Sequence, residues 1–197
     1  KVDPSVPLPE GTPVWVNPLH IVTRPEKPNK WRICHDARST VDRKCLNEEV
    51  LTGPDVVNSL LGVLLRFRQH MVTISADIQG FFHQVFTTEE DAHVFRYWWF
   101  EDEELVTLSM YEMMVHIFGA KSSPTVATYV LRRHGETLTG SVSAEVLDAI
   151  VKSFYVDDLL RSCPTVEAAK ALRVDLTEAL LKGGFFLTKW KASHEEV

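Results

Sequence analysis

The sequence of 197 residues has few cysteines and no long apolar run. Its three cysteines, Cys34, Cys45 and Cys163, include no Cys-x-x-Cys pair, which argues against a disulfide framework or zinc site and fits a reducing compartment. No apolar run reaches the roughly 20 residues that span a bilayer, so we expect no membrane partner. The sequence also lacks repeats, a signal peptide and an initial methionine. We therefore expect a globular domain cut from something larger.

The net charge of -6 conceals a segregation of charge along the chain. An acidic mean argues against a protein that binds nucleic acid electrostatically. However, residues 24–44 carry seven basic and three acidic side chains, whereas residues 71–110 carry eight acidic and one basic. The mean is thus a poor guide, and the basic segment is suited to phosphates.

Periodicity and turn residues predict an α+β fold. Strands are expected at 18–22 and 31–36 around a tip at 25–29, at 71–77, at 94–100 and 105–111 around an acidic tip, at 153–156 and 159–162, and at 185–190. Helices are expected from Gly53-Pro54-Asp55 to Phe67, from Ser123 to about His134 with Gly135 as the stop, at 144–152, and from Thr165 to Gly183-Gly184. From residue 71, without the acidic hairpin and the shorter helix, the order is β-α-β-β-α-β, a split ferredoxin-like arrangement.

This order can bring together carboxylates that are distant in sequence. Asp77 ends one strand, and Asp157-Asp158 is expected as the two-residue loop between two others. The first and third strands can be neighbours in such a sheet, so Asp77 and Asp157 can converge. Converging carboxylates repel unless a divalent cation neutralises them, and oxygen ligands suit Mg²⁺. The alternative for Asp157-Asp158 is a plain polar turn.

Several motifs together resemble a known family. Tyr155-Val156-Asp157-Asp158 and the segment 76–85 around Asp77 resemble the catalytic motifs of reverse transcriptases. Further motifs resemble the polymerase of Pao/BEL-type LTR retrotransposons: Leu46-Asn47, Leu51-Thr52-Gly53-Pro54, Leu65-Arg66-Phe67-Arg68, Phe118-Gly119 with Ser122-Ser123-Pro124, and Gly183-Gly184-Phe185 with Lys189-Trp190. The resemblance runs from about His20 to Val197.

The resemblance implies a catalytic role for several residues. Asp77 and Asp157 would be the principal ligands of two Mg²⁺ ions, for which Mn²⁺ is a possible substitute, helped by the backbone carbonyl of Ile78. Asp158 would be a further catalytic ligand, closer to the primer end. Lys189 would protonate the leaving pyrophosphate, with an ordinary strand lysine as the alternative.

It also implies a nucleotide site. Arg32 would reach the triphosphate, and Lys27 or Lys30 would add a second cation or be a solvated turn lysine. The backbone N–H groups of Gly80 and Phe81 would face the phosphates, and Phe118-Gly119 would line the nucleotide. Phe82 would be the steric gate against a 2′-hydroxyl: if Phe81 and Phe82 alternate on a strand, both cannot be core. For Trp98, Trp99 and Phe100, core packing is expected over base stacking, since Glu101 to Glu104 would repel phosphates.

The implied protein is an RNA-directed DNA polymerase, a nucleotidyltransferase within a retrotransposon polyprotein. Fingers are expected at about 1–70 and 91–120 and the palm at 71–90 and 121–197, without thumb or RNase H. The expected partners are an RNA or DNA template with primer, deoxynucleoside triphosphates, and the missing thumb and RNase H regions of the polyprotein. The resemblance implies a cytoplasmic location within virus-like particles.

Two alternatives stay open. One is an inactive or host-adopted copy that serves as a nucleic-acid-binding or interaction module. The other is an RNA-binding domain, since the same β-α-β-β-α-β order serves that purpose.

Overall fold

The computed structural model describes the backbone of residues 1–197 and all side chains except those of residues 24 and 27–30. The chain divides into two compact units: unit 1 comprises Lys1–Gly53 and Val85–Ser123, and unit 2 comprises Pro54–Gln84 and Pro124–Val197.

Unit 1 contains two antiparallel hairpins and short helical turns. Its elements are β1 (Leu19–Arg24), β2 (Lys27–His35), α1 (Leu46–Glu49), α3 (Glu89–Ala92), the 3-10 turn η2 (His93–Phe95), β4 (Arg96–Phe100) and β5 (Leu108–Glu112). Both hairpins were expected from the sequence, although the β1–β2 tip is shorter than the expected 25–29 because Arg24 already pairs with Lys27. A small core holds the unit together, formed by Ala37, Leu46, Phe95, Ile117 and Ala120.

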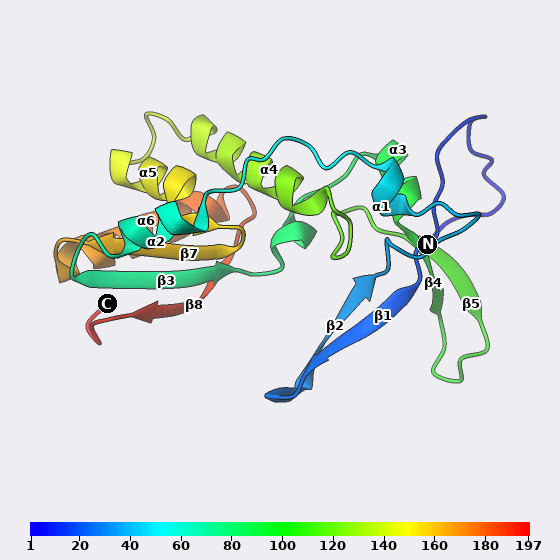
Figure 1. Ribbon diagram of the computed structural model, residues 1–197, viewed down its shortest axis with the longest axis horizontal. Coiled ribbons are helices and arrows are strands. Elements are labelled where there is room, and N and C mark those ends of the chain that lie inside the picture. Colours follow the sequence, from blue (N-terminus) through cyan, green and yellow to red (C-terminus); the bar gives the residue numbers. More distant parts are fainter. The chain divides into compact units, whose positions relative to one another are not determined.

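Unit 2 is built on an antiparallel sheet of four strands. Its elements are α2 (Leu60–Phe67), β3 (Val72–Ile78), the 3-10 turn η1 (Phe81–Gln84), α4 (Ser123–Thr137, whose first residue is the last of unit 1), α5 (Ala144–Lys152), β6 (Phe154–Tyr155), β7 (Asp158–Cys163), α6 (Val166–Leu181) and β8 (Leu187–Ala192). The strand order is β6-β7-β3-β8, and β7, β3 and β8 run side by side in Figure 1. The predicted β-α-β-β-α-β order, with first and third strands adjacent, is therefore confirmed.

The sheet has one buried and one more open face. Along β3 burial alternates, with Val72, Ile74, Ala76 and Ile78 buried and Asp77 on the opposite face. The helix α6 contacts β3, β7 and β8 and buries Leu172, Leu176 and Leu180 among others. Apolar burial thus fixes the register of β3 and leaves Asp77 on the more open face.

Two helix boundaries were predicted wrongly. The helix expected from Gly53 begins only at Leu60, where the Ser59 side chain caps it, and its first two residues, Leu60 and Leu61, are exposed. Gly135 does not stop α4, which continues to Thr137. A Cβ at Gly135 would lie 2.9 Å from Cγ2 of Ile150, so the absence of a side chain there serves close approach to α5.

Two turns also differ from expectation. In the β6–β7 hairpin Tyr155 pairs with Asp158, so the two-residue loop is Val156-Asp157 and not Asp157-Asp158. Phe81 and Phe82 lie in a 3-10 turn, so the argument from alternation on a strand does not apply to them. In the part of the chain that the structure describes, no helix has the length and apolarity to cross a bilayer.

Candidate catalytic carboxylate site

Asp77 lies next to the other candidate aspartates in the sheet of unit 2. The register pairs it with Asp158 of β7 on one side and with Thr188 of β8 on the other. Directly paired residues point to the same face, so Asp77 and Asp158 share the more open face. The amide of Ile78 donates a hydrogen bond to the carbonyl oxygen of Asp157 at 2.9 Å. The backbone thus brings Asp77, Asp157 and Asp158 to one end of neighbouring strands.

The turn that carries Asp157 has an unfavourable backbone. Val156 has a φ of 57°, which is rare for a β-branched residue and costs on the order of 1–3 kcal/mol. Such a conformation persists only where surrounding contacts hold it. The bond from Ile78 to Asp157 is one such contact, and it joins the strained turn to the strand that bears Asp77.

Lys189 reaches the site through an irregularity in β8. Ser75 pairs with Lys191 and Asp77 with Thr188, so β8 carries one extra residue between these pairs. Lys189 sits in this bulge with a φ of 56°. Its Nζ lies 2.7 Å from Oδ1 of Asp77. Lys189 therefore forms an ion pair with Asp77 across the two neighbouring strands.

The donor set suits a hard divalent cation in chemistry. The carboxylates of Asp77, Asp157 and Asp158 and the carbonyl of Ile78 are oxygen ligands of the kind that Mg²⁺ prefers. Among the residues whose side chains are described, however, no three His, Cys, Asp or Glu gather closely enough to hold a metal ion. The residues fit Mg²⁺ by chemical type, and the side chain of Asp77 is directed to Lys189.

Gly80, Phe81 and Phe82 follow Asp77 in a tight turn. Gly80 has a φ of 58°, a conformation that glycine adopts readily. The Phe81 ring is 2% exposed and packs 5.9 Å from the ring of Phe185, so Phe81 belongs to the core. The Phe82 ring lies 5.9 Å from that of Phe81 and is half-buried. Of the two rings, that of Phe82 is the more exposed.

Three of the predicted nucleotide-binding residues lie close together in unit 1. Arg32 is exposed on β2, and its guanidinium carbon lies 5.9 Å from the centre of the Phe118 ring. The carbonyl oxygen of Phe118 accepts a hydrogen bond from the His35 amide at 3.0 Å. Gly119 has a φ of 119°, and a Cβ there would lie 2.0 Å from the His35 carbonyl oxygen. The side chains of Lys27 and Lys30 lie outside the described residues.

Asn47 is a supporting residue that sequence reasoning did not single out as part of the site. Its Nδ2 donates to the carbonyl oxygen of Gly119 at 2.9 Å, and its Oδ1 accepts from the Lys121 amide at 2.8 Å. The only signal was its place in the Leu46-Asn47 motif. A hollow of about 460 Å³ adjoins this segment, lined by His20, His35, Asp36, Ala37, Arg38 and Gly119.

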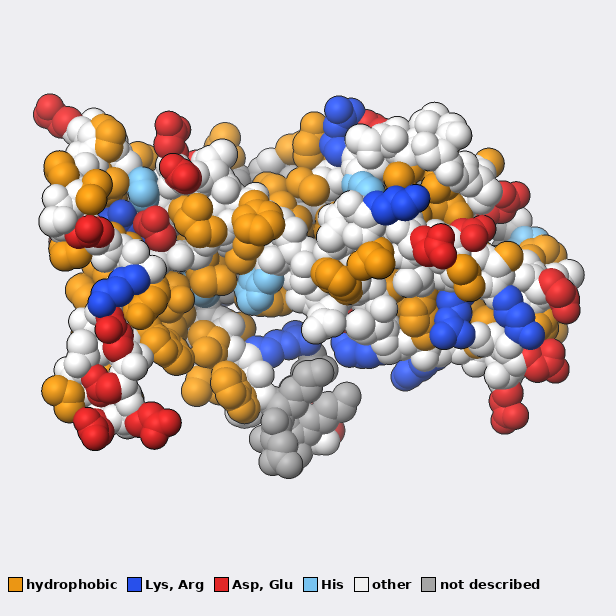
Figure 2. All heavy atoms as spheres, turned by 180° about the vertical axis from the view of Figure 1, so that it is seen from behind, with side chains coloured by type: hydrophobic (Ala, Val, Ile, Leu, Met, Phe, Trp, Pro, Cys, Tyr) orange, Lys and Arg blue, Asp and Glu red, His pale blue; other side chains and the backbone are white. Residues whose placement is uncertain are grey.

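The expectation that the aromatic residues of β4 are core is wrong. Trp98, Trp99 and Phe100 are 48%, 46% and 41% exposed. The physical reason is that β4 and β5 form a sheet of two strands, and the bridge of β4 to Val16 involves its first residue, Arg96, and not the three aromatic residues. Figure 2 shows acidic side chains gathered at the far end of the hairpin, where Glu101, Glu103 and Glu104 lie.

Known structures share this fold. The chain is similar to a foamy viral protease-reverse transcriptase in complex with double-stranded DNA, with 20% identity, a TM-score of 0.66, and coverage of 88% of this chain and 26% of that one. The same viral protein in complex with an RNA/DNA hybrid gives 19% identity, a TM-score of 0.62 and coverage of 91% and 21%. The native prototype foamy virus protease-reverse transcriptase gives 17% identity, a TM-score of 0.62, and coverage of 87% of this chain and 20% of that one.

These similarities show a reverse-transcriptase-like fold. The chain spans about a quarter or less of the length of these chains. No family model matches the sequence, and no curated protein matches it.

Proposed function

We propose that this chain is the polymerase core of a reverse transcriptase, with unit 1 as fingers and unit 2 as palm. The reaction is attack of a primer 3′-hydroxyl on the α-phosphate of a deoxynucleoside triphosphate, directed by an RNA or DNA template. The observation that carries the proposal is the β3–β7 register, which sets Asp77 opposite Asp158 and bonds Ile78 to Asp157. The foamy viral structures, complexes with DNA and with an RNA/DNA hybrid, support it through their common fold.

The chain's own residues would share the work as follows. Asp77, Asp157, Asp158 and the Ile78 carbonyl would hold the divalent cations. Two bound Mg²⁺ ions would supply activation of the attacking oxygen and charge stabilisation at the leaving one. Lys189, already at Asp77, would leave that carboxylate and donate a proton to the leaving pyrophosphate.

Several residues would bind the nucleotide. Arg32 presents a planar guanidinium that can hold two phosphate oxygens, and its position beside the Phe118 ring restrains it. The backbone N–H groups of Gly80 and Phe81 would face the phosphates. Phe118 and Gly119 would line the nucleotide, and Phe82 would exclude a ribose 2′-hydroxyl.

We also propose the finer family assignment and setting. The Pao/BEL type rests on the motifs quoted above, and a cytoplasmic location within virus-like particles follows from that type. Thumb and RNase H regions of the same polyprotein would hold the duplex, so we expect weak primer-template binding from this chain by itself.

The test is single-turnover nucleotide incorporation on a primed RNA template at high protein concentration. Asp77→Asn and Asp157→Asn should each reduce incorporation at least about 10³-fold. Asp175→Asn, an exposed aspartate of α6, is the charge-matched control and should retain the wild-type rate. Incorporation that survives both active-site changes would sink the proposal.

A binding module without catalysis is the second candidate. It is favoured by the exposed aromatic residues of β4, because aromatic rings can stack on unpaired bases. Binding of single-stranded RNA that Trp98→Ala weakens, with no Mg²⁺-dependent incorporation, would support this candidate instead.

A further inference from the structure

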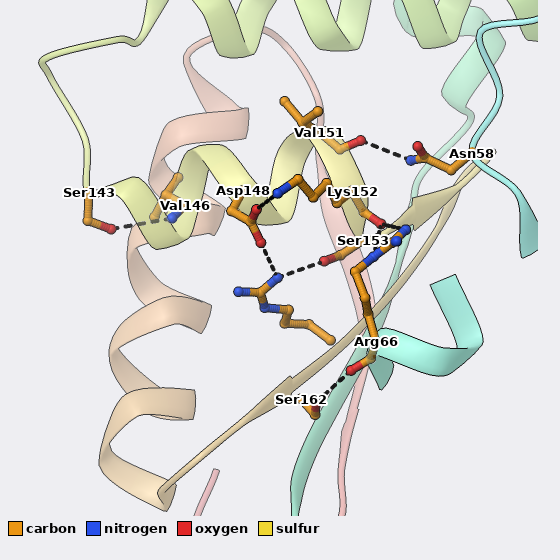
Figure 3. Close-up of polar contacts among 10 residues, drawn as sticks. Asn58, Arg66, Ser143, Val146, Asp148, Val151, Lys152, Ser153 and Ser162 are labelled. Atoms are coloured by element: carbon orange, nitrogen blue, oxygen red, sulfur yellow. Dashed lines mark hydrogen bonds and ion pairs between the residues drawn. The ribbon is translucent and has the colours of Figure 1, made fainter. Parts of the chain in front are cut away.

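The residues just before the Tyr155-Val156-Asp157-Asp158 hairpin are held by side chains from distant segments (Figure 3). Nδ2 of Asn58 donates to two carbonyl oxygens, that of Val151 at 3.0 Å and that of Phe154 at 2.9 Å. Oδ1 of Asn58 accepts from Nη2 of Arg132 at 2.9 Å. The whole amide is therefore engaged, and its orientation is fixed.

Two arginine side chains bind Lys152 and Ser153, the residues between Val151 and Phe154. Nε and Nη2 of Arg66 donate to the Lys152 carbonyl oxygen at 3.2 and 2.7 Å. Nη1 of Arg161 donates to Oγ of Ser153 at 3.3 Å and to Oδ2 of Asp148 at 2.6 Å. Residues 151–154 are thus each bound by a side chain from elsewhere. We call the three side chains of Asn58, Arg66 and Arg161 the collar.

The collar satisfies groups that secondary structure leaves without partners. Val151 and Lys152 lie in the last turn of α5, where carbonyl oxygens have no partner within the helix. Phe154 lies in β6, which has two residues and pairs only with β7 at the edge of the sheet. Asn58 bonds a carbonyl in each of these elements, so it joins the end of α5 to the start of the hairpin.

The β6–β7 hairpin is short and contains a strained loop residue, so contacts from outside stabilise it. It has two paired positions, Phe154 with Leu159 and Tyr155 with Asp158, and its loop contains the strained Val156. A short hairpin is barely stable by itself, and the strain favours other conformations. The place of Asp157 beside β3 is therefore set from two ends, by the bond from Ile78 and by the collar.

We propose that Asn58 is a positioning residue for the catalytic hairpin: through the Phe154 carbonyl it fixes where Asp157 stands relative to Asp77. That the hairpin is catalytic rests on the proposed function. That Asn58 holds the hairpin in place rests on the hydrogen bonds alone. Arg66, which belongs to the Leu65-Arg66-Phe67-Arg68 motif, supports the same segment through the Lys152 carbonyl oxygen.

The first measurement is residue-resolved amide hydrogen exchange on the full chain, with Asn58→Ala and Asn58→Asp. Asn58→Asp keeps the size and the acceptor for Arg132 but removes both N–H donors. Exchange should accelerate about tenfold at two amides, Ile78, which bonds Asp157, and Leu160, which bonds Ser153. The amide of Leu180 in α6 should be unchanged.

The second measurement is Mn²⁺ binding to the same variants by electron paramagnetic resonance. Mutation of a residue that orients a metal ligand typically lowers metal affinity about 10–100-fold. We therefore expect the Mn²⁺ affinity of both Asn58 variants to fall at least about tenfold. Leu176→Ala, which removes a fully buried side chain of α6 far from the collar in sequence, is the control for lost stability. It should destabilise unit 2 at least as much and leave Mn²⁺ affinity unchanged while the chain is folded.

The outcomes are distinct. Uniform acceleration of exchange, or a loss of Mn²⁺ affinity that Leu176→Ala reproduces, would show a merely structural role and overturn the proposal. Local acceleration with lost Mn²⁺ affinity supports it. Should Asp77→Asn leave Mn²⁺ binding and incorporation intact, the proposed function fails; the exchange at Ile78 and Leu160 then still decides whether Asn58 holds the hairpin.

Discussion

The ammonium nitrogen of Lys189 lies 2.7 Å from Oδ1 of Asp77. The contact depends on the bulge in β8, which supplies one extra residue opposite β3 and places Lys189 at a positive φ. The Lys189 side chain is 53% exposed, so the ion pair is screened by solvent and adds little to stability. Replacing Lys189 therefore tests chemistry more than folding.

Lys189→Gln should slow single-turnover incorporation about 10²-fold, because it removes the proton donor to pyrophosphate. The free energy of unfolding, measured in urea, should change by less than about 1 kcal/mol. Lys191→Gln, an exposed lysine on the same strand, is the matched control and should keep the wild-type rate. Equal rates for the two variants would remove Lys189 from the mechanism.

Phe82→Val should relax the choice of sugar, because a smaller side chain leaves room for a 2′-hydroxyl. We expect the ratio of deoxynucleotide to ribonucleotide incorporation to fall at least about tenfold, a loss of roughly 1.4 kcal/mol in discrimination. Phe81→Val is the neighbouring control: its ring is buried against Phe185, so it should lower stability and leave the ratio unchanged. If Phe81→Val lowers the ratio of deoxynucleotide to ribonucleotide incorporation and Phe82→Val does not, Phe81 and not Phe82 is the steric gate.

Gly119→Ala should destabilise unit 1 by about 3 kcal/mol or more, since the new Cβ would meet the His35 carbonyl oxygen at 2.0 Å and φ is positive. Gly11→Ala separates the two causes. Gly11 has a φ of 82° with nothing within 4 Å, so it should cost only about 1 kcal/mol. Urea unfolding followed by tryptophan fluorescence measures the free energy of unfolding of both variants. Similar losses of stability would show that movement of the backbone near His35 relieves the clash at Gly119.

Asp148→Asn should remove a pH-dependent part of the stability of unit 2. Burial by itself would raise the pKa of Asp148, but hydrogen bonds from Lys152 and Arg161 outweigh it and hold the pKa below its ordinary value. A carboxyl with a lowered folded pKa stabilises above its unfolded pKa of about 3.9, and this contribution is lost as pH falls through the folded pKa.

The measurement for Asp148 is urea unfolding of wild type and variant at several pH values. At pH 7 we expect a difference of about 1 kcal/mol, since both partners are partly exposed. The difference should shrink below about pH 4. A difference that is constant from pH 7 to pH 3 would exclude this carboxylate as its source.

Local pattern was a good guide where one face of an element is buried. The alternation of β3 follows from its sequence, because Val72, Ile74 and Ala76 must turn to the core together. The Thr165 cap and the apolar spacing of α6 were likewise readable. Strand order followed from the order of elements, since few arrangements of β-α-β-β-α-β exist.

Pattern failed where long-range contacts decide. Gly135 reads as a helix stop, yet it lies inside α4 because Ile150 approaches it. The aromatic run in β4 was expected in the core, yet β4 and β5 form a sheet of two strands and the three rings are exposed. Asn58 gives no signal in the sequence, because its partners are more than 70 positions away.

By itself, the sequence determined Asp77, Asp157 and Asp158 as candidate residues at the ends of predicted strands, because hydrophobic periodicity and turn chemistry are local properties. Lys189 became a candidate only through the resemblance to a known family. Only the tertiary structure decided that Asp157 lies inside the turn and Asp158 in the strand opposite Asp77. It alone decided that a bulge turns Lys189 to Asp77 and that Asn58 supports the hairpin. Register, bulges and side-chain bonds between distant segments depend on how the whole sheet packs, and no short stretch of sequence specifies them.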